Sequence, residues 1–295
     1  MKTDSSVKPL KSYSPLIAYR TLLFRPSTCG TIFKYLYVVV KDFFLLQFLQ
    51  AVHITHRPVI HVDHPLDDKI PFTPSKIDIY LDFINYWIRP LSMLIKKFGA
   101  KKAAPYAKEW VEAITLAYSQ ASRMYRHCMS TTNRPDYRET LQFRQVHALD
   151  PHLLCVPSLH ISICAMVVVF YRKLFAIEDF TQEEKVTWSK ELYEGANAIS
   201  ETVLYVKQHS VNCIAGAYYM VTKLFKDMMT PSDAIMFTQS LFADAQDVKK
   251  EDVEAIHNHI SFTYERFLLE GAFEDDWFGS ILRWINTYEK DSKEY

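Results

Sequence analysis

The sequence lacks any cysteine pattern that would indicate a disulfide framework. It has five cysteines in 295 residues, and no two of them form a C-x-x-C pair. An odd number of cysteines without such pairs gives no framework of disulfides. We therefore expect reduced thiols on apolar faces. The cysteines are Cys29, Cys128, Cys155, Cys164 and Cys213.

An excess of charge of one sign is also missing. The chain has 34 basic and 34 acidic residues, which gives a formal net charge of zero. Proteins that bind nucleic acid through counterion release carry a basic excess, so we do not expect nucleic acid as a partner. With 49% hydrophobic residues, the chain can bury a large core, as one domain or as one domain with an appendage.

Long apolar runs are scarce. A membrane-spanning helix needs about 20 mostly apolar residues, and the one uncharged stretch of that length covers residues 151–171. The apolar run at 38–48 is interrupted by Lys41 and Asp42, and the mean hydropathy is -0.10. We therefore expect a cytoplasmic or peripherally membrane-associated protein. An integral membrane protein is the alternative, because helices around an active site tolerate inward-facing charges.

The residues that are present predict an all-α fold in three parts. Residues 1–60 would form an irregular N-terminal arm over 1–34, with a short helix near residues 16–23, and an apolar helix over 33–53, placed in the core or against a bilayer surface. Residues 61–228 would form the catalytic core. Residues 229–295 would add a C-terminal helical extension, whose amphipathic tail is expected to pack on that core.

Within the core segment, helical spacing predicts helices over 74–98 and 108–129, followed by a polar loop over 136–151. Loops that frame a site often determine specificity, so this loop offers side chains for a substrate headgroup, although a plain solvated loop is the alternative. Those side chains are Arg138, Arg144, His147 and His152.

A helical hairpin is expected next. Its helices would cover 153–176 and 183–208, and Thr181 with Glu184 resembles a capping box between them. Because both helices rise by 1.5 Å per residue, the start of the first and the end of the second should lie at the same level. The second helix is expected to carry position 209 and to continue or kink beyond it.

Groups suited to phosphate chemistry concentrate in three short segments. A phosphate ester bound without a metal needs fixed donors, which Arg134, Lys207, Ser158 and free amides at a helix start can supply. Splitting the ester needs a nucleophile and a proton donor, and two histidines can fill both roles. A lone buried histidine is more often a core residue, but two in this setting predict metal-free phosphoryl transfer. The segments are Asn133-Arg134-Pro135, Cys155-Val156-Pro157-Ser158-Leu159-His160 and Lys207-Gln208-His209.

These segments resemble the type 2 phosphatidic acid phosphatase (PAP2) superfamily, which includes lipid phosphatases, bacterial acid phosphatases and vanadium haloperoxidases. Arg134-Pro135 matches the end of its first motif. Residues 157–160 match the P-S-L-H form of the second motif, and residues 202–209 are similar to S-T-L-x-x-K-Q-H in the same bacterial branch. Residues 67–74 also resemble the D-x-x-I-P-F-x-P segment of that branch. The resemblance implies a PAP2-like helical bundle that uses no cofactor and no metal.

The resemblance also implies roles for individual residues. His209 would attack phosphorus and form a phosphohistidine, while His160 would protonate the leaving group. Arg134, Lys207 and Ser158 would bind the phosphoryl oxygens.

Two departures from the family pattern affect these roles. The lysine expected seven residues before Arg134 is His127, and the nearby Arg126 or Arg123 would take its place as a phosphate-binding residue. The aspartate expected four residues after His209 is Cys213, with Asn212 beside it. These two residues are the candidates for orienting the nucleophile, and an amide can hold the imidazole tautomer but cannot stabilise its charge.

A second group of histidines has the spacing of two H-x-x-H units. That spacing suggests zinc, but the intervening prolines favour a loop or an extended strand, and no further ligand set accompanies it, so no metal site is expected. The histidines are His53, His56, His61 and His64.

Three functions follow. The first is a phosphatase acting on a phosphorylated lipid or a small phosphate ester. The second is a lipid headgroup phosphotransferase with the same site, which differs in whether water or an alcohol reaches His209. The third is a non-catalytic descendant that binds an anionic headgroup, suggested by Cys213.

Overall fold

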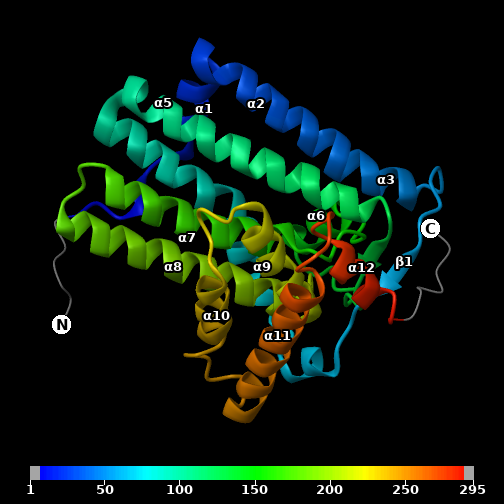
Figure 1. The fold of residues 1–295 in the computed structure, drawn as a ribbon. Helices are drawn as coiled ribbons and strands as arrows, with labels where there is room; N and C mark the ends of the chain where they lie inside the picture. The colour runs from blue at the N-terminus through cyan, green and yellow to red at the C-terminus, as the bar shows by residue number, and fades with distance from the viewer. Residues whose placement is uncertain (1–6, 289–295) are drawn as a thin grey trace.

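The computed structural model describes residues 7–288, and helices dominate it throughout. At its centre, α7 (Leu159–Ile177) packs against α5 (Phe83–Tyr125), α8 (Gln182–Tyr205) and α9 (Asn212–Leu224). Figure 1 shows α7 and α8 as a long hairpin beneath α5. One hydrophobic core includes residues from all three predicted segments, from Leu10 to Ile285. The predicted all-α class is confirmed.

The uncharged stretch that includes the second motif forms the central helix of this bundle. By length and composition alone, α7 is the one helix within residues 7–288 that could cross a membrane, and 67% of its most apolar window is buried inside the protein. A core helix of a soluble protein has the same properties.

The N-terminal part is helical where an irregular arm was expected. Pro15 and Pro26 each stand in the first turn of a helix, where a missing N–H costs nothing because that group has no intrahelical partner. The short helix predicted near residues 16–23 is confirmed, whereas the irregular conformation expected for the rest of the arm is wrong from Pro26 on. The predicted helix over 33–53 is confirmed but begins earlier. The elements are α1 (Pro15–Leu23), α2 (Pro26–Val39), a π-helical turn (Val40–Leu45) and α3 (Leu46–Ala51).

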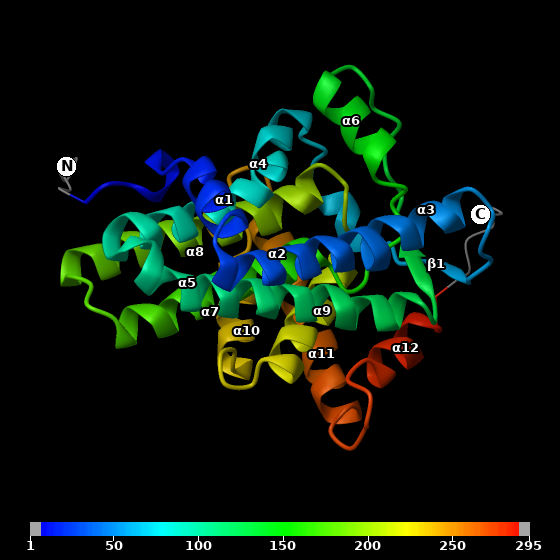
Figure 2. The ribbon, with the colours of Figure 1, turned by 90° about the horizontal axis from the view of Figure 1, so that it is seen from above.

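These N-terminal helices cover one side of α5. Both α1 and α2 contact α5, and Figure 2 shows α2 and α3 extending along it as one rod. The helix predicted over 74–98 corresponds to the short α4 (Ile77–Leu81) together with the first part of α5. The helix predicted over 108–129 corresponds to the second part of α5, and a break at Gly99 separates the two parts. The break needs glycine because the backbone there has φ 78, a left-handed conformation.

Two short strands tie the candidate site segments together. β1 (Val59–His61) pairs in parallel with β2 (Met129–Thr131), with Ile60 opposite Ser130. Ser130 also bridges to Leu154, just before the second motif. The extended conformation expected around the H-x-x-H histidines is therefore present, and it places the turn at Arg134 beside the start of α7.

The hairpin prediction is confirmed, with one correction. Thr181 and Glu184 form the expected capping box at the start of α8. However, α8 ends at Tyr205 and α9 begins at Asn212, so His209 lies in a connecting loop and not on a helix. The predicted loop over 136–151 also contains a helix, α6 (Leu141–Leu149), which the Thr140 side chain caps by accepting a hydrogen bond from the Phe143 amide.

The C-terminal segment packs on the bundle as expected. Its longest helix, α11, contacts α9, and Trp277, Phe278 and Trp284 are buried. The predicted amphipathic tail is therefore part of the core. The elements are α10 (Pro231–Ser240), α11 (Lys250–Glu270) and α12 (Gly279–Ile285).

One glycine on α8 allows a close helix contact that a methyl group would break. A Cβ atom at Gly195 would lie 2.7 Å from Cε2 of Tyr86, and the Tyr86 hydroxyl donates to the Leu192 carbonyl at 2.7 Å, which fixes the ring. We expect Gly195→Ala to lower the free energy of unfolding by about 1–2 kcal/mol, because overpacking outweighs the gain in helix propensity. Urea unfolding measures the change.

The matched control is Gly30→Ala on α2. A Cβ atom there would meet nothing within 4 Å, so alanine should raise the free energy of unfolding by about 0.5–1 kcal/mol. Equal effects of the two substitutions would contradict the close contact at Gly195.

Candidate active site

A cavity of about 340 Å³ lies at the start of α7, enclosed by the π-helical turn, α4, α6 and the loop before α9. Three of its lining residues are histidines, from three separate segments of the chain. Aromatic rings from the α4–α5 region form the opposite wall. The lining includes Tyr80, Phe83, His152, His160, Gln208 and His209.

His160 stands in the first turn of α7 and is held by aromatic rings. Its ring centroid is 4.9 Å from that of Tyr80 and 4.6 Å from that of Phe83. The His209 ring centroid is 5.7 Å away. The two predicted catalytic histidines therefore meet, as the hairpin argument required.

His209 is placed by its loop and contacts the second motif. Its backbone amide donates to the Val203 carbonyl at 3.1 Å, near the end of α8. Its Nε2 lies 3.1 Å from Oγ of Ser158, which is fully buried and caps α7 by accepting a hydrogen bond from the Ile161 amide. Ser158 is therefore at the site as predicted, in contact with the candidate nucleophile.

Burial keeps both imidazoles neutral at physiological pH. Burial lowers the pKa of His160 to about 4. Burial also lowers the pKa of His209 to about 3; the neighbouring His160 acts in the same direction, and the Cys155 carbonyl opposes them. A neutral imidazole retains the lone pair that a nucleophile needs.

Arg134 reaches the cavity wall indirectly. Its guanidinium donates to Oε1 of Gln208 at 3.2 Å and to the Asp150 carbonyl at 3.2 and 3.3 Å. Of these three residues, Gln208 and Asp150 line the cavity. The predicted phosphate-binding arginine is thus directly behind the wall that carries His209.

Lys207 points away from the cavity. Its Nζ donates to the carbonyls of Asp67 and Ile70, at 2.5 and 2.6 Å. In return, Oδ1 of Asp67 accepts a hydrogen bond from the Val211 amide at 2.8 Å. Lys207 and Asp67 therefore clamp both sides of the loop that presents His209.

The basic residues before Arg134 are not brought to the cavity either. The Arg126 guanidinium forms an ion pair with Asp42 at 2.5 Å, on the π-helical turn. Arg123 pairs with Asp276, and the His127 ring packs against Phe278. Phosphate binding by Arg126 stays a sequence prediction that this arrangement does not favour.

Asn212 belongs to a different polar cluster. Its Nδ2 donates to the Val62 carbonyl at 3.0 Å and to the Tyr288 hydroxyl at 3.1 Å, and its Oδ1 accepts from Nε2 of His259 at 2.7 Å. The His259 ring stacks on His64 with centroids 4.0 Å apart. The amide thus joins α9 to α11 and does not orient His209.

Cys213 is buried beside the loop. Its Sγ accepts a hydrogen bond from the Ser210 amide at 3.4 Å. Within residues 7–288, Nδ1 of His209 is buried and has no hydrogen bond of good geometry. The Cys155 carbonyl acts on the ring, but no side-chain carboxylate or amide within residues 7–288 orients it as in a usual nucleophilic histidine.

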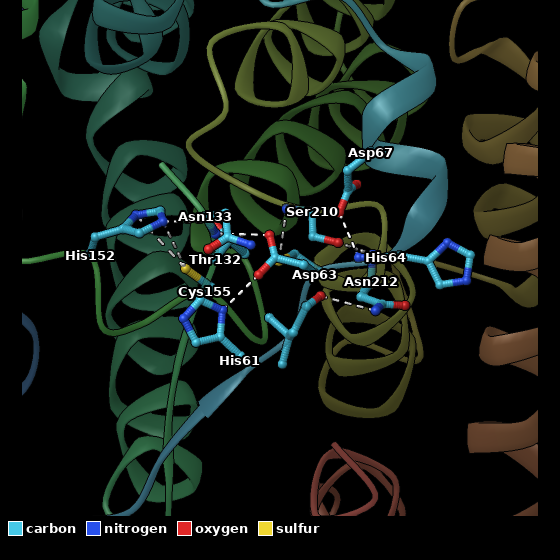
Figure 3. Close-up of polar contacts among 12 residues, drawn as sticks. His61, Asp63, His64, Asp67, Thr132, Asn133, His152, Cys155, Ser210 and Asn212 are labelled. Carbon is cyan, nitrogen blue, oxygen red and sulfur yellow. Dashed lines mark hydrogen bonds and ion pairs between the residues drawn. The ribbon is translucent and has the colours of Figure 1, made fainter. Parts of the chain in front are cut away.

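The third histidine of the cavity, His152, was expected on a loop over the site, either offered to a substrate headgroup or solvated. Its side chain lines the cavity and is buried, and its Nε2 lies 2.7 Å from Oγ1 of Thr132. Sγ of Cys155 lies 3.8 Å from the same Nε2 atom. Figure 3 shows the His152 ring with dashed contacts to both residues. The backbone φ of 64 at His152 turns the ring inward, and no sequence pattern signals that conformation.

Two of the four H-x-x-H histidines, His61 and His64, have structural partners. Nδ1 of His61 lies 2.7 Å from Asp63, which also accepts from the Asn133 amide at 2.8 Å. Nδ1 of His64 accepts from the Leu66 amide at 3.2 Å. Figure 3 shows these contacts linking the segment after β1 to the turn before Arg134. The described residues contain no group of three or more His, Cys, Asp or Glu side chains placed to hold a metal ion.

Burial of neutral histidines makes stability depend on pH. For His160 the pKa is about 4 in the folded protein and about 6.5 in the unfolded chain, so the unfolded state binds more protons between these values. The contribution is fully present above about pH 6.5 and is lost as the pH falls.

We expect His160→Phe, which fits between Tyr80 and Phe83, to reduce the slope of unfolding free energy against pH. The reduction between pH 6 and 4.5 should approach about 1.4 kcal/mol per pH unit. Urea unfolding at several pH values measures the slope. An unchanged slope would mean that His160 titrates normally.

Comparison with known proteins gives no match: no family model matches the chain, and no curated protein or solved structure is significantly similar to it. The residues around the cavity are therefore the basis for assigning a function.

Proposed function

We propose that this chain is a metal-independent phosphatase that acts on a phosphomonoester through a phosphohistidine at His209. The observation that carries the proposal is the meeting of His160 and His209 at one cavity, with the Ser158 hydroxyl 3.1 Å from Nε2 of His209. The three residues come from segments 157–160 and 207–209, which are the two segments that resemble PAP2 motifs most closely. The resemblance and the geometry support the same assignment independently.

The first step forms the phosphohistidine. Nε2 of neutral His209 attacks phosphorus, and the P–N bond forms as the P–O bond to the leaving group breaks. The Ser158 hydroxyl, which faces Nε2 in the free site, then donates to a phosphoryl oxygen. The amides at the first turn of α7 lie next to this position and favour an anion.

His160 supplies the proton for the departing alkoxide. Its pKa of about 4 means that the proton must arrive with the substrate. A phosphomonoester has a second pKa of about 6 and carries a proton as the monoanion, and the bound negative charge favours the protonated imidazole. Water then attacks phosphorus, His160 accepts its proton, and the P–N bond breaks to release phosphate and His209.

Fewer residues bind phosphate in the proposed reaction than the sequence predicts. Arg134 would release the Asp150 carbonyl or Gln208 to reach a phosphoryl oxygen from behind the cavity wall. Lys207 and Arg126 already bind other groups and have no part in the proposed reaction.

A non-catalytic headgroup-binding protein is the second candidate. The observation that favours it is the buried Nδ1 of His209, which has no orienting carboxylate or amide. Binding of an anionic headgroup needs the cavity and the α7 amides but not an oriented nucleophile. The following variants separate the two candidates.

We expect the effect of His160→Gln to depend on the leaving group. Release of the leaving group from an alkyl phosphate should fall by about 100-fold or more, because general acid catalysis of alkoxide departure is lost. Release of nitrophenolate from p-nitrophenyl phosphate should fall much less, since nitrophenolate leaves without a proton. The loss of His160 as base for the attacking water affects both substrates alike, so single-turnover rates of leaving-group release, with a chelator present, measure the difference. Equal losses would contradict the acid role.

His209→Gln should abolish phosphate release from both substrates and remove the acid-labile phosphoenzyme trapped by rapid quenching. The matched control is His257→Gln on α11, whose Nε2 bonds to the Leu241 carbonyl outside the cavity. If the unaltered protein releases no phosphate from either substrate but still binds phosphate, the headgroup-binding alternative is established.

Restoring an acid near the nucleophile should accelerate turnover. We expect Cys213→Asp to raise kcat, because a carboxylate beside the His209 loop can stabilise the imidazolium and shift the acidic limb of the pH profile. Urea unfolding checks that the buried charge is tolerated. A folded variant with unchanged or lower kcat would show that position 213 does not correspond to the orienting aspartate.

A further inference from the structure

The outer face of the N-terminal helices exposes an unusual amount of apolar surface. Of the 24 large hydrophobic side chains exposed within residues 7–288, eleven lie between residues 16 and 54. Phe24 is 84% exposed, Phe33 63% and Tyr37 62%. The others are Leu16, Tyr19, Leu36, Val40, Phe44, Leu45, Val52 and Ile54.

Several of these side chains form one stripe on α2 and the π-helical turn. Positions 33, 36, 37, 40 and 44 follow one another at helical spacing. Val38 and Tyr35, on the opposite face, pack into the core, so the stripe points outward. Contiguous exposed apolar surface of this kind marks an interaction site.

The segment that forms this face is basic although the whole chain is neutral. Residues 15–57 contain five cations and a single acid, Asp42, which is paired with Arg126. Lys34 and Lys41 flank the apolar stripe and are exposed, and Nζ of Lys41 lies 5.5 Å from the Tyr37 ring centroid. The five cations are Arg20, Arg25, Lys34, Lys41 and Arg57.

This face continues into the rim of the histidine cavity. Phe44 belongs to the stripe and also lines the cavity. Leu81, Ile84 and Leu149 line the cavity as well, and each is exposed. Figure 2 shows the α2–α3 rod with α4 and α6, which carry Leu81 and Leu149, on one side of it. The rim is therefore apolar, whereas the interior holds the histidines.

We propose that the outer face of α1, α2 and α3 docks on a bilayer surface that contains anionic lipids. Aromatic and aliphatic side chains would enter the interface, while Lys34 and Lys41 extend to lipid phosphates. A second copy of the chain fits less well, because a symmetric contact would place these cations against themselves. The docking proposal depends only on the properties of this surface. The role of docking in presenting a lipid phosphate to the cavity rests on the proposed function.

Vesicle sedimentation of the full chain tests the docking. We expect binding to mixed phosphatidylcholine and phosphatidylglycerol vesicles, weaker binding to phosphatidylcholine alone, and loss of the difference at high salt. The double variant Phe33→Glu/Tyr37→Glu should bind at least about tenfold more weakly. The double variant Lys34→Glu/Lys41→Glu should lose the preference for anionic vesicles.

The matched control carries the same change on the other side of the protein. Phe262 and Leu269 on α11 are 69% and 78% exposed, and Figure 1 shows α11 on the side of the bundle away from α2. Phe262→Glu/Leu269→Glu should bind vesicles like the unaltered chain. Absence of vesicle binding, or equal binding by all variants, would overturn the proposal.

Two further measurements keep the alternatives apart. Sedimentation velocity detects a dimer, and a dimer that Phe33→Glu/Tyr37→Glu dissociates would assign the face to a second copy. Hydrolysis of soluble p-nitrophenyl phosphate should be unchanged in that variant, since the substitutions lie outside the cavity. Vesicle binding without phosphate release would support the docking and refute the proposed function.

Discussion

Burial of α7 is the constraint on which the candidate site depends. The helix is enclosed by α5, α8 and α9, so its first turn cannot shift without disturbing the core. The Tyr125 hydroxyl donates to the Pro157 carbonyl at 2.6 Å, and Ser158 caps the helix. His160 is therefore fixed by the core itself, whereas His209 depends on the contacts of a six-residue loop between α8 and α9.

The loop that carries His209 is held by Lys207 and Asp67. Lys207 donates to the carbonyls of the segment after His64, and Asp67 accepts from the Val211 amide. These bonds stabilise the backbone around His209, but within residues 7–288 no side chain orients Nδ1 of its imidazole. Burial and the neighbouring His160 favour the neutral ring, and the Cys155 carbonyl opposes them. In the proposed reaction His209 would therefore attack without the help of a carboxylate, and this would limit the rate.

Local and periodic features of this fold could be predicted from the sequence, and features set by distant contacts could not. The Thr181–Glu184 capping box and the meeting of the two histidines followed from residue spacing and helix rise. Arg126 could not be placed, because its partner Asp42 lies 84 positions away. Lys207 and His152 could not be placed either, since both adopt a left-handed backbone that residues other than glycine seldom take. Proximity in sequence predicts that Asn212 orients His209. Its hydrogen-bond partners are instead Val62, just after β1, His259 on α11, and Tyr288, after α12.

The size of the cavity connects the proposed chemistry with the proposed surface. Its volume of about 340 Å³ is at the lower end of the range for small-ligand sites, so it accommodates a phosphate headgroup but not the acyl chains of a phospholipid. If the substrate is a lipid phosphate, its chains must stay outside, against the rim formed by Phe44, Leu81 and Leu149. A rim of that composition is poorly suited to water but well suited to hydrocarbon. An enzyme docked through α2 and α3 would therefore leave the chains in the bilayer and draw only the headgroup toward His209.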